Sequence, residues 1–309
     1  MSDIRVLAYL HTFNDADVIE TTIQALCNQS YPIPEILLVD NASSDNTLSR
    51  AFPSKVTIIR NDRNLGTSGA VAVGMKYALD HGYDWIYILD ADSLPETDAV
   101  ANLIRCYNDL GPELQASTWW LSSLLREANG PVVHHGGVFT PRGIEAVDPP
   151  REPLHYQCHT NMWSGSFYRL EVVRKVGLPD FNYVLDWGDM IYGYEGWMRG
   201  YIGFLDQSSV VRHNLHPVAT QYSRRLGTRF VKLFHSPPIR MYYFWRNSMY
   251  FWLHRYEGKN RGKLLLAHLF LLLKWLVKVA LFANSPGPTI RVCLRGMWDG
   301  LHGRLENRY

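Results

Sequence analysis

Two carboxylates separated by one small residue stand at the end of an apolar run. The run is DWIYILD, residues 84–90, and Ala91 and Asp92 follow it, so that Asp90 and Asp92 lie two positions apart. Two carboxylates this close repel each other where water is partly excluded, and a divalent cation removes that cost. Mg²⁺ prefers oxygen ligands and leaves positions for phosphate and water. The pair predicts a metal site, with helix capping by Asp92 and Ser93 as the alternative.

The elements that must position this pair can be predicted from the apolar spacing. Strands are expected at 4–10, 35–40, 55–60 and 84–90, and helices at 16–28, 67–81 and 99–110, the last of which could begin near Pro95. Strands that alternate with helices predict an α/β fold with a doubly wound, mostly parallel sheet. Such sheets bind ligands beyond the carboxyl ends of their strands.

Polar residues follow each of the four expected strands. The segments are TFN (12–14), Asp40 with NASSDNT, NDRNLGTSGA (61–70) and Asp90 to Asp92. One polar strand end is ordinary loop chemistry, but four around one edge predict a site for a polar ligand that contains phosphate.

The order of these motifs, followed by SGSFYR (164–169), resembles the family 2 inverting glycosyltransferases, which have the GT-A fold. The resemblance extends over roughly residues 4–216 and is greatest to the rhamnosyltransferase and galactofuranosyltransferase branch. The C-terminal pattern of that branch is echoed by YYFWRNSMYFWLHRY (242–256) and RGMWDGLHGR (295–304). The resemblance implies a GT-A catalytic domain at 1–216, and the charge and apolar spacing of the rest, described below, predict a helical, basic, membrane-associating region at 217–309.

The resemblance also implies a binding site for a nucleotide-sugar donor. Thr12 and Asp40 would contact the nucleoside, and the loop around Asn64 and Gly66 would lie along the nucleotide, where glycine permits a close approach. Turn formation is the alternative role for Asp40. The substrate-binding residues expected in this way are Thr12, Asn14, Asp40, Asn64, Gly66, Asp90, Trp163 and Glu195.

The same comparison indicates the metal ligands. Asp92 would bind the metal directly, Asp90 would reach the metal or the ribose, and His213 would complete the metal shell, with His216 as the alternative histidine. The expected cofactor is Mn²⁺ or Mg²⁺. A neutral imidazole ligand suits Mn²⁺ better than Mg²⁺. Without the resemblance, a lone histidine is more often a structural residue.

A general base is expected in FNYVLDWGDMIYGYEGWMRGY (181–201). Relatives have a D-x-x-D-x-E segment here, which puts Asp186 and Asp189 on the two aspartate positions. Asp189 would take the proton of the acceptor hydroxyl, and Asp186 would orient a sugar. Ile191 and Glu195 depart from the pattern, so Glu195 is the second candidate for the base. The alternative for Asp189 is a helix cap.

The segments between these motifs are less regular. Residues 111–165 predict short antiparallel strands and loops that cover the site, and residues 201–213 predict two more short strands. Beyond Pro217 the chain is expected to be helical.

Charge divides the chain into two parts. Residues 1–211 have 14 Lys and Arg against 26 Asp and Glu, a charge of −12, whereas residues 212–309 have 17 against 3, a charge of +14. A basic tail favours an anionic surface, either phospholipid or nucleic acid.

The four cysteines form no CxxC pair, which argues against a zinc site and fits a reducing compartment. The first residues lack the pattern of a secretory signal.

The tail contains one long apolar segment, KLLLAHLFLLLKWLVKVALFA (263–283). A lysine near a bilayer centre costs ~2.5–3.5 kcal/mol, so the two central lysines make spanning marginal. Lys263, Lys274 and Lys278 fall along one narrow stripe of the helix, which favours a helix lying in the membrane interface. The alternatives are a helix buried in a soluble core and a dimer face.

These observations predict an enzyme that transfers a sugar from a nucleotide diphosphate, UDP or dTDP, to a hydroxyl of a glycan that is lipid-linked. It would act in the cytoplasm, peripheral to the inner face of the membrane, with a homodimer left open. A polyprenyl phosphate acceptor and a nucleotidyltransferase are the alternatives. Nucleic acid is not expected as a partner, because the sequence shows no RNA-binding signature.

Overall fold

The structure is a computed structural model that describes residues 4–127, 130, 132–134, 136–213, 222–226, 229–232, 238–282 and 286–306. The chain forms two compact units. Unit 1 comprises Met1–Phe139, Ile144–Phe181 and Asp189–His216. Unit 2 comprises Thr140–Gly143, Asn182–Gly188 and Pro217–Tyr309.

A mixed β-sheet forms the centre of unit 1. Its strands are β1 (Val6–Thr12), β2 (Glu35–Asp40), β3 (Val56–Arg60), β4 (Trp85–Asp90), β5 (Leu94–Pro95), β6 (Thr118–Glu127), β7 (Val132–His134), β10 (His155–Cys158), β11 (Ser166–Arg169) and β12 (Ile202–His213). The strand order is β10-β12-β6-β11-β4-β1-β2-β3, with β5 beside β12 and β7 beside β6. Strands β3, β2, β1, β4, β6 and β12 run in one direction, and β11 runs against its neighbours β4 and β6. The expected mostly parallel α/β sheet is confirmed.

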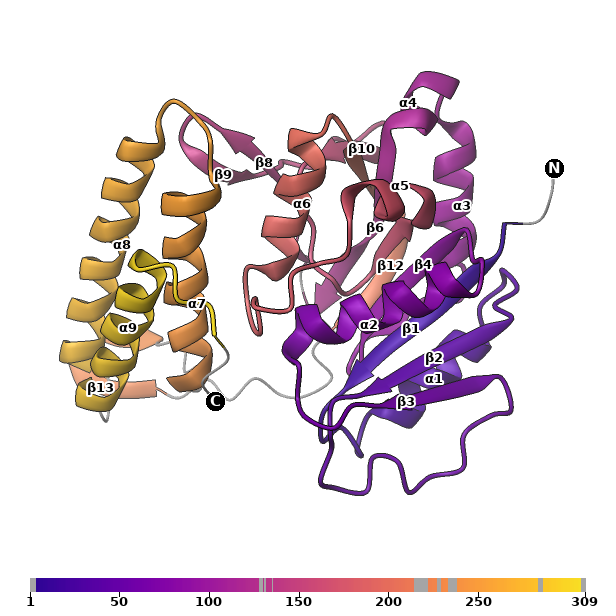
Figure 1. Cartoon of the computed structure of the whole chain (residues 1–309), viewed down its shortest axis with the longest axis horizontal. Helices are drawn as coiled ribbons and strands as arrows, with labels where there is room; N and C mark the ends of the chain where they lie inside the picture. The colour runs from indigo at the N-terminus through magenta and orange to yellow at the C-terminus, as the bar shows by residue number, and fades with distance from the viewer. Residues whose placement is uncertain are drawn as a thin grey trace. The chain divides into compact units, whose positions relative to one another are not determined.

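Helices cover both faces of this sheet. They are α1 (Ile19–Cys27), α2 (Gly66–Asp80), α3 (Ala99–Asp109), α4 (Pro112–Ser117), α5 (Leu170–Val176) and α6 (Gly188–Met198). Apolar residues of α1 and α3 pack into one core beneath β1 and β4, and those of α2 and α5 pack into a second core on the opposite face. Figure 1 shows α2 in front of the sheet and α1 behind it. Two buried cores explain why the central strands are apolar on both faces.

Three expectations about the middle of the chain need correction. Strands β7 and β10 are short and antiparallel, as expected for residues 111–165, but residues 118–127 form the long, buried strand β6 between β11 and β12. Pro95 does not begin a helix, because it lies in β5 opposite Val211, and α3 begins at Ala99. Residues 202–213 form one strand with an irregular register between Asp206 and Val210 rather than two strands. A separate two-stranded sheet consists of β8 (Gly137–Thr140) and β9 (Gly143–Ala146).

Unit 2 is built mainly from helices. They are α7 (Pro238–Tyr250), the π-helical turn η1 (Phe251–Arg255), α8 (Arg261–Phe282) and α9 (Pro286–Leu301). Helices α7 and α9 approach each other closely, since a Cβ at Gly296 would lie 2.3 Å from the Tyr242 carbonyl oxygen. Two short strands, β13 (Tyr222–Leu226) and β14 (Arg229–Lys232), pair before α7, so the region beyond Pro217 is not wholly helical.

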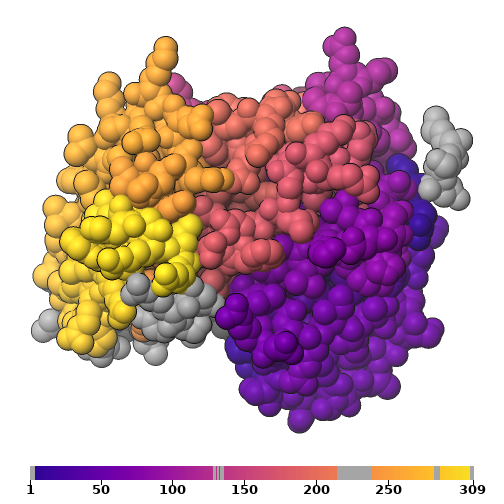
Figure 2. Space-filling view, viewed as in Figure 1, coloured from indigo at the N-terminus to yellow at the C-terminus, as the bar shows by residue number. Residues whose placement is uncertain are grey.

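Helix α8 confirms the long helix expected near the C-terminus. Arg261–Leu281 is long and apolar enough to cross a membrane by length and composition, and most of this helix is not buried inside the structure. Leu272 on one side of α8 is 4% exposed and packs near Trp245 and Cys293, whereas Leu266 on the other side is 68% exposed. The space-filling view shows atoms of α8, orange to gold, at the surface (Figure 2). Helix α8 therefore has one buried face and one exposed apolar face.

Candidate active site

The ends of four neighbouring strands bring the predicted polar residues to one edge of the sheet. Thr12 on β1 is in register with Asp40 on β2, and Asp40 is in register with Arg60 on β3. On its other side, β1 pairs with β4, so that His11 is in register with Asp90. Because these strands are parallel, their carboxyl ends share this edge, which is where α/β sheets bind ligands.

Asp40 is fully buried at this edge and accepts hydrogen bonds from the loop that follows it. Its carboxylate oxygens accept from the Ser43 N–H at 3.2 and 3.3 Å. The Arg60 Nε atom lies 3.4 Å from Asp40 Oδ2, and Arg60 Nη2 donates to the Ser43 carbonyl at 2.9 Å. Asp40 therefore stabilises the turn after β2, which was the alternative role considered for it. The mostly exposed guanidinium of Arg60 lies beside its carboxylate.

Asn14 holds the loops after β1 and β2 together. Its Oδ1 atom accepts from the Ser44 N–H at 2.8 Å and the Asp45 N–H at 3.3 Å, and its own N–H donates to Ser43 Oγ at 2.9 Å. Asn14 has φ 61°, a left-handed conformation that asparagine tolerates better than most residues. Thr12, which is buried, donates its hydroxyl to Asp15 Oδ2 at 2.9 Å.

The loop after β3 leads into the N-terminus of α2. Asn64 Oδ1 accepts from the Gly66 N–H at 2.8 Å, and Gly66 has φ 71°, which a residue with a Cβ rarely adopts. Asn41 Nδ2 donates to the Gly66 carbonyl at 3.2 Å, so this loop is tied to the end of β2. A helix N-terminus beside polar loops suits the negative charge of a phosphate.

Asp90, Asp92 and His213 form a group that fits a divalent cation. One potential ligand atom from each residue lies within 4.8 Å of the others. His213 Nε2 lies 3.8 Å from Asp90 Oδ2, and His213 Nδ1 lies 3.5 Å from Asp92 Oδ1. Two carboxylates and an imidazole are donors that suit Mn²⁺, and Mg²⁺ with fewer protein ligands. The group thus brings together the three predicted ligands, whereas His216 lies outside the described residues.

Helix capping does not explain Asp92 and Ser93. Helix α3 begins after Asp98, six residues beyond Asp92, and it has no side-chain cap. Ser93 Oγ instead lies 2.6 Å from His213 Nδ1 and 2.7 Å from Ser164 Oγ. The residues that follow Asp92 therefore serve the same side-chain cluster.

His11 belongs to this cluster and was not predicted. His11 Nε2 lies 3.4 Å from Asp90 Oδ1, and its Nδ1 atom is buried without a hydrogen-bond partner in the structure. Tyr9 stacks on His11 with ring centroids 6.0 Å apart. Burial, and to a lesser extent the charge of Asp90, raises the pKa of Tyr9 well above its usual value. A histidine immediately before a polar strand end was the available signal.

Asp189 and Glu195 lie on α6 in unit 1. Asp189 is in the first turn rather than at the cap, and its Oδ1 accepts from the Met190 N–H at 2.8 Å. Burial, and then the charge of Asp189, raises the pKa of Tyr168, which indicates that the carboxylate lies near this tyrosine. Trp163 is 4% exposed and packs against Tyr168 and Tyr192, with its indole nitrogen buried and without a partner.

Asp186 belongs to unit 2. Its carboxylate accepts from Arg240, with Nε 3.1 Å from Oδ1 and 3.2 Å from Oδ2, and Nη2 3.0 Å from Oδ1. Asn247, which is fully buried on α7, donates Nδ2 to the carbonyls of Leu185 and Asp186 at 2.8 and 2.9 Å. Asp186 and Trp187 both have positive φ, 53° and 67°. Such a conformation costs energy and persists only where neighbouring groups hold it.

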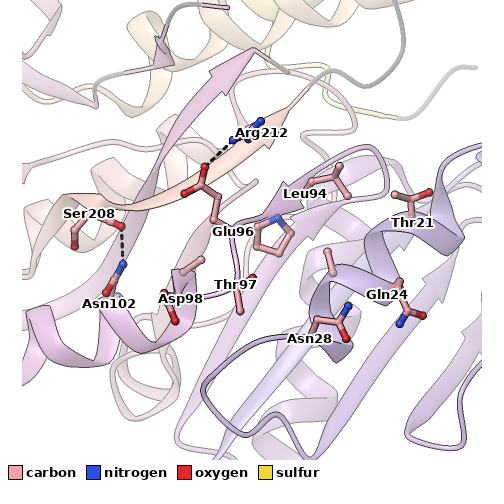
Figure 3. Close-up of a pocket in the computed structure, with 13 residues that line it drawn as sticks. Thr21, Gln24, Asn28, Leu94, Glu96, Thr97, Asp98, Asn102, Ser208 and Arg212 are labelled. Carbon is pink, nitrogen blue, oxygen red and sulfur yellow. Dashed lines mark hydrogen bonds and ion pairs between the residues drawn. The ribbon is translucent and has the colours of Figure 1, made fainter. Parts of the chain in front are cut away.

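A separate pocket of about 930 Å³ lies beside the elements that hold the metal ligands (Figure 3). It is lined by α1, by the segment from Leu94 to Ala99 and by β12, including Ser208 and Arg212. Arg212 Nη2 lies 3.1 Å from Glu96 Oε1, and Asn102 Nδ2 donates to the Ser208 carbonyl at 2.6 Å. None of the predicted site residues lines this pocket.

Comparisons with known proteins indicate a glycosyltransferase family for part of the chain. Residues 9–140 match the family model described as Glycosyl transferase family 2. The chain is 24% identical over 269 residues to galactofuranosyltransferase GlfT1 of Mycolicibacterium smegmatis. The aligned region covers 79% of this chain and 82% of the relative.

Two solved structures share the fold. Mannosyltransferase PcManGT from Pyrobaculum calidifontis, in complex with GDP-Man and Mn²⁺, has a TM-score of 0.58 and 17% identity, covering 99% of this chain and 88% of that chain. S. aureus TarS 1-349, in complex with UDP-GlcNAc, has a TM-score of 0.57 and 14% identity, covering 98% and 83%. The expected GT-A fold is confirmed. Residues 9–140 match a family 2 glycosyltransferase domain, and the relative that is similar over most of the chain is a glycosyltransferase.

Proposed function

We propose that this glycosyltransferase moves a sugar from a nucleotide diphosphate to a hydroxyl of a bacterial glycan, with inversion at the anomeric carbon. The observation that carries the proposal is the Asp90, Asp92 and His213 group, at the same sheet edge as Asp40. Carboxylates and an imidazole suit a cation, and a cation beside a helix N-terminus suits a diphosphate. UDP or dTDP is the proposed nucleotide.

The donor would bind along the carboxyl ends of β1 to β4. Thr12, Asn14 and Asp40 would shape the nucleoside pocket, since Asn14 already ties the two loops together. Asn64 and Gly66 would lie along the nucleotide. Asp90, Asp92 and His213 would hold Mn²⁺ or Mg²⁺, which supplies charge stabilisation to the departing diphosphate when bound.

The acceptor would be activated from α6. Asp189 would accept the proton of the attacking hydroxyl, and Glu195 on the same helix is the second candidate for this role. Asp186 would orient a sugar, and Trp163 would contribute to the sugar pocket through its unpartnered indole nitrogen. The partly buried position of Asp189 near Tyr168 supports this assignment, because it leaves the carboxylate accessible to an acceptor.

The similar proteins support the donor and the metal. PcManGT is in complex with GDP-Man and Mn²⁺, TarS is in complex with UDP-GlcNAc, and GlfT1 is a galactofuranosyltransferase. The family match also favours glycosyl transfer over the nucleotidyltransferase alternative.

A thermal-shift screen tests the donor. UDP-, dTDP- and GDP-sugars are added with Mn²⁺, with Mg²⁺ and with EDTA, because a ligand that binds only the folded state raises the unfolding temperature. One nucleotide is expected to stabilise the chain, and only with a metal. Equal stabilisation with EDTA, or none with any nucleotide, would contradict the proposal.

The acceptor is proposed to be lipid-linked, and the enzyme to work in the cytoplasm at the inner face of the membrane. Helix α8 supports this, because Leu266, Phe270 and Val277 form an exposed apolar stripe. Lys274, at the edge of the stripe, lies with Nζ 4.8 Å from the Phe270 ring centroid. Lysines beside an apolar stripe suit a helix lying in an interface with anionic headgroups.

Vesicle flotation tests this surface. The full chain is expected to float with vesicles that contain phosphatidylglycerol and less with pure phosphatidylcholine. The triple variant Leu266→Ser, Phe270→Ser, Val277→Ser is expected to lose binding, whereas Leu114→Ser, an exposed leucine on α4, is the matched control. Unchanged flotation of the triple variant would refute membrane contact. A concentration-dependent dimer lost in the same variant would assign the surface to the homodimer instead.

The polyprenyl phosphate alternative differs in its need for a base. A phosphate acceptor is already ionised, whereas a hydroxyl must lose its proton. A large loss of activity in Asp189→Asn with a glycan acceptor therefore favours the hydroxyl, and retained activity favours the phosphate.

A further inference from the structure

Two buried serines connect the predicted metal ligands. Ser93 Oγ lies 2.6 Å from His213 Nδ1 and 2.7 Å from Ser164 Oγ. Ser164 Oγ accepts the Asp90 N–H at 3.3 Å. Both serine side chains are fully buried. The serine pair thus joins the backbone of one predicted ligand to the ring of another.

The pair restricts how His213 can present its ring. Nδ1 is engaged by Ser93 at 2.6 Å and also faces Asp92 Oδ1 at 3.5 Å, so Nε2, which faces Asp90 at 3.8 Å, is the nitrogen left for a cation. Nε2 can bind a cation only through its lone pair, which requires the proton to be on Nδ1. Ser93 Oγ must then accept a hydrogen bond from His213.

Ser164 allows that direction, because either serine can be the donor in the hydrogen bond between them. The hydroxyl of Ser93 can donate to Ser164 Oγ, which leaves a lone pair of Ser93 Oγ for the Nδ1–H of His213. Without Ser164, the Ser93 hydroxyl would donate to His213 Nδ1. The ring proton would then be on Nε2, which would have no lone pair left for the cation. No bulk water can replace either partner, because both serines are buried.

The local fold holds the pair in place. Ser93 follows Asp92 directly, and Ser164 lies before β11, where Gly165 has φ 80° and its N–H donates to the Ile88 carbonyl at 2.9 Å. A Cβ at Gly165 would lie 3.2 Å from Leu125 and 3.3 Å from Ser123. The Ser-Gly-Ser turn therefore keeps Ser164 against β4 beside the carboxylates.

We propose that Ser93 and Ser164 are positioning residues that hold His213 with its proton on Nδ1, so that Nε2 is free to bind a divalent cation. The proposal rests on the metal site of the proposed function. Partners of metal-binding histidines of this kind typically change metal affinity about 10- to 100-fold when removed.

Isothermal titration of the full chain with Mn²⁺ and with Mg²⁺ tests the proposal without using activity. Ser93→Ala is expected to weaken Mn²⁺ binding about 10- to 100-fold, with a smaller loss for Ser164→Ala. Mg²⁺ binding should change less, because Mg²⁺ depends less on an imidazole. Ser123→Ala is the matched control, since Ser123 is equally buried and bonds to Ser209 at 2.7 Å.

A double-mutant cycle separates this role from a merely structural one. In the His213→Ala background, Ser93→Ala is expected to cause no further loss of Mn²⁺ affinity. Wild-type affinity in the folded Ser93→Ala protein, or an undiminished loss in the His213→Ala background, would overturn the role of the serines while leaving the cation site intact. Absence of Mn²⁺ binding to the wild type would overturn the cation site itself and the serine role with it.

Discussion

Asp90 at the sheet edge of unit 1 and Asp186 in the Asn182–Gly188 segment of unit 2 have different basic side chains beside them. Asp90 in unit 1 lies near two histidines, His11 at 3.4 Å and His213 at 3.8 Å. Asp186 in unit 2 is bound through both oxygens by Arg240. An imidazole can be neutral, whereas a guanidinium stays charged at any physiological pH.

This difference separates the chemistry available to the two carboxylates. Asp90 has no guanidinium or ammonium among the ion pairs described for it, only the two imidazoles, and an imidazole can share a metal ion with a carboxylate. Asp186 is already neutralised by Arg240, which suits it to orientation rather than to binding a metal or accepting a proton. We therefore expect a metal ion at the sheet edge. We expect the Arg240–Asp186 pair to orient a bound group instead.

Removing a charge from the sheet edge should have the largest effect. Asp92→Asn is expected to lower the turnover about 1,000-fold or more, because a metal supplies several kcal/mol of charge stabilisation. Initial rates at saturating donor measure the effect, and Asp109→Asn, an exposed aspartate at the end of α3, is the control. Normal turnover of Asp92→Asn would contradict the conclusion that the sheet edge, unlike the Asp186 segment, binds a metal ion.

The base should rank next. Asp189→Asn is expected to lower kcat about 10²- to 10⁴-fold, the usual contribution of general base catalysis, with donor binding unchanged. Glu195→Gln, on the same helix, should retain most of the activity. If the two variants behave in the opposite way, Glu195 is the base.

A smaller effect is expected at Arg240. Arg240→Gln leaves Asp186 without its charged partner and should raise the KM for a substrate about fivefold, with little change in kcat, because the pair is partly exposed. Asp186→Asn should give a similar change. A drop in kcat as large as that of Asp189→Asn would show that Asp186 takes part in the chemistry.

The last effect concerns stability and leaves the turnover of the enzyme unchanged at neutral pH. Burial lowers the pKa of His268 on α8 to about 4, below its usual value near 6.5. Because the folded state needs the neutral ring, its contribution is complete above pH 6.5 and is lost as the pH falls towards 4, by about 3 kcal/mol in all. Urea unfolding at several pH values measures this loss. His268→Gln should make the free energy of unfolding depend less steeply on pH between 4 and 6.5. An unchanged pH dependence in this variant would contradict the role of His268.

The sequence was most informative where chemistry follows a strand directly. Asp40, Asp90 and Asp92 could be located because an apolar strand ends just before them, and parallel strands share their carboxyl edge. The expected grouping of Asp90, Asp92 and His213 appears in the structure. The roles of Asp186, Asp189 and Trp163 stay predictions.

The middle of the chain was harder to interpret. Strand β6 was missed because Trp, Ser and Leu succeed one another without alternation, as expected for a strand buried on both faces. The role of Ser93 was invisible because its partners, Ser164 and His213, lie 71 and 120 residues away. Arg240 was equally remote from Asp186, at 54 residues.

The sequence by itself determined the fold class, the resemblance to a glycosyltransferase family and the polar edge, because these depend on local periodicity and on motifs that follow strands. Only the tertiary structure decided which groups meet each carboxylate. That outcome depends on strand order and on helix packing, which bring His11 beside Asp90 and Arg240 beside Asp186. Contacts between distant residues set the local charge, and no spacing along the chain encodes them directly.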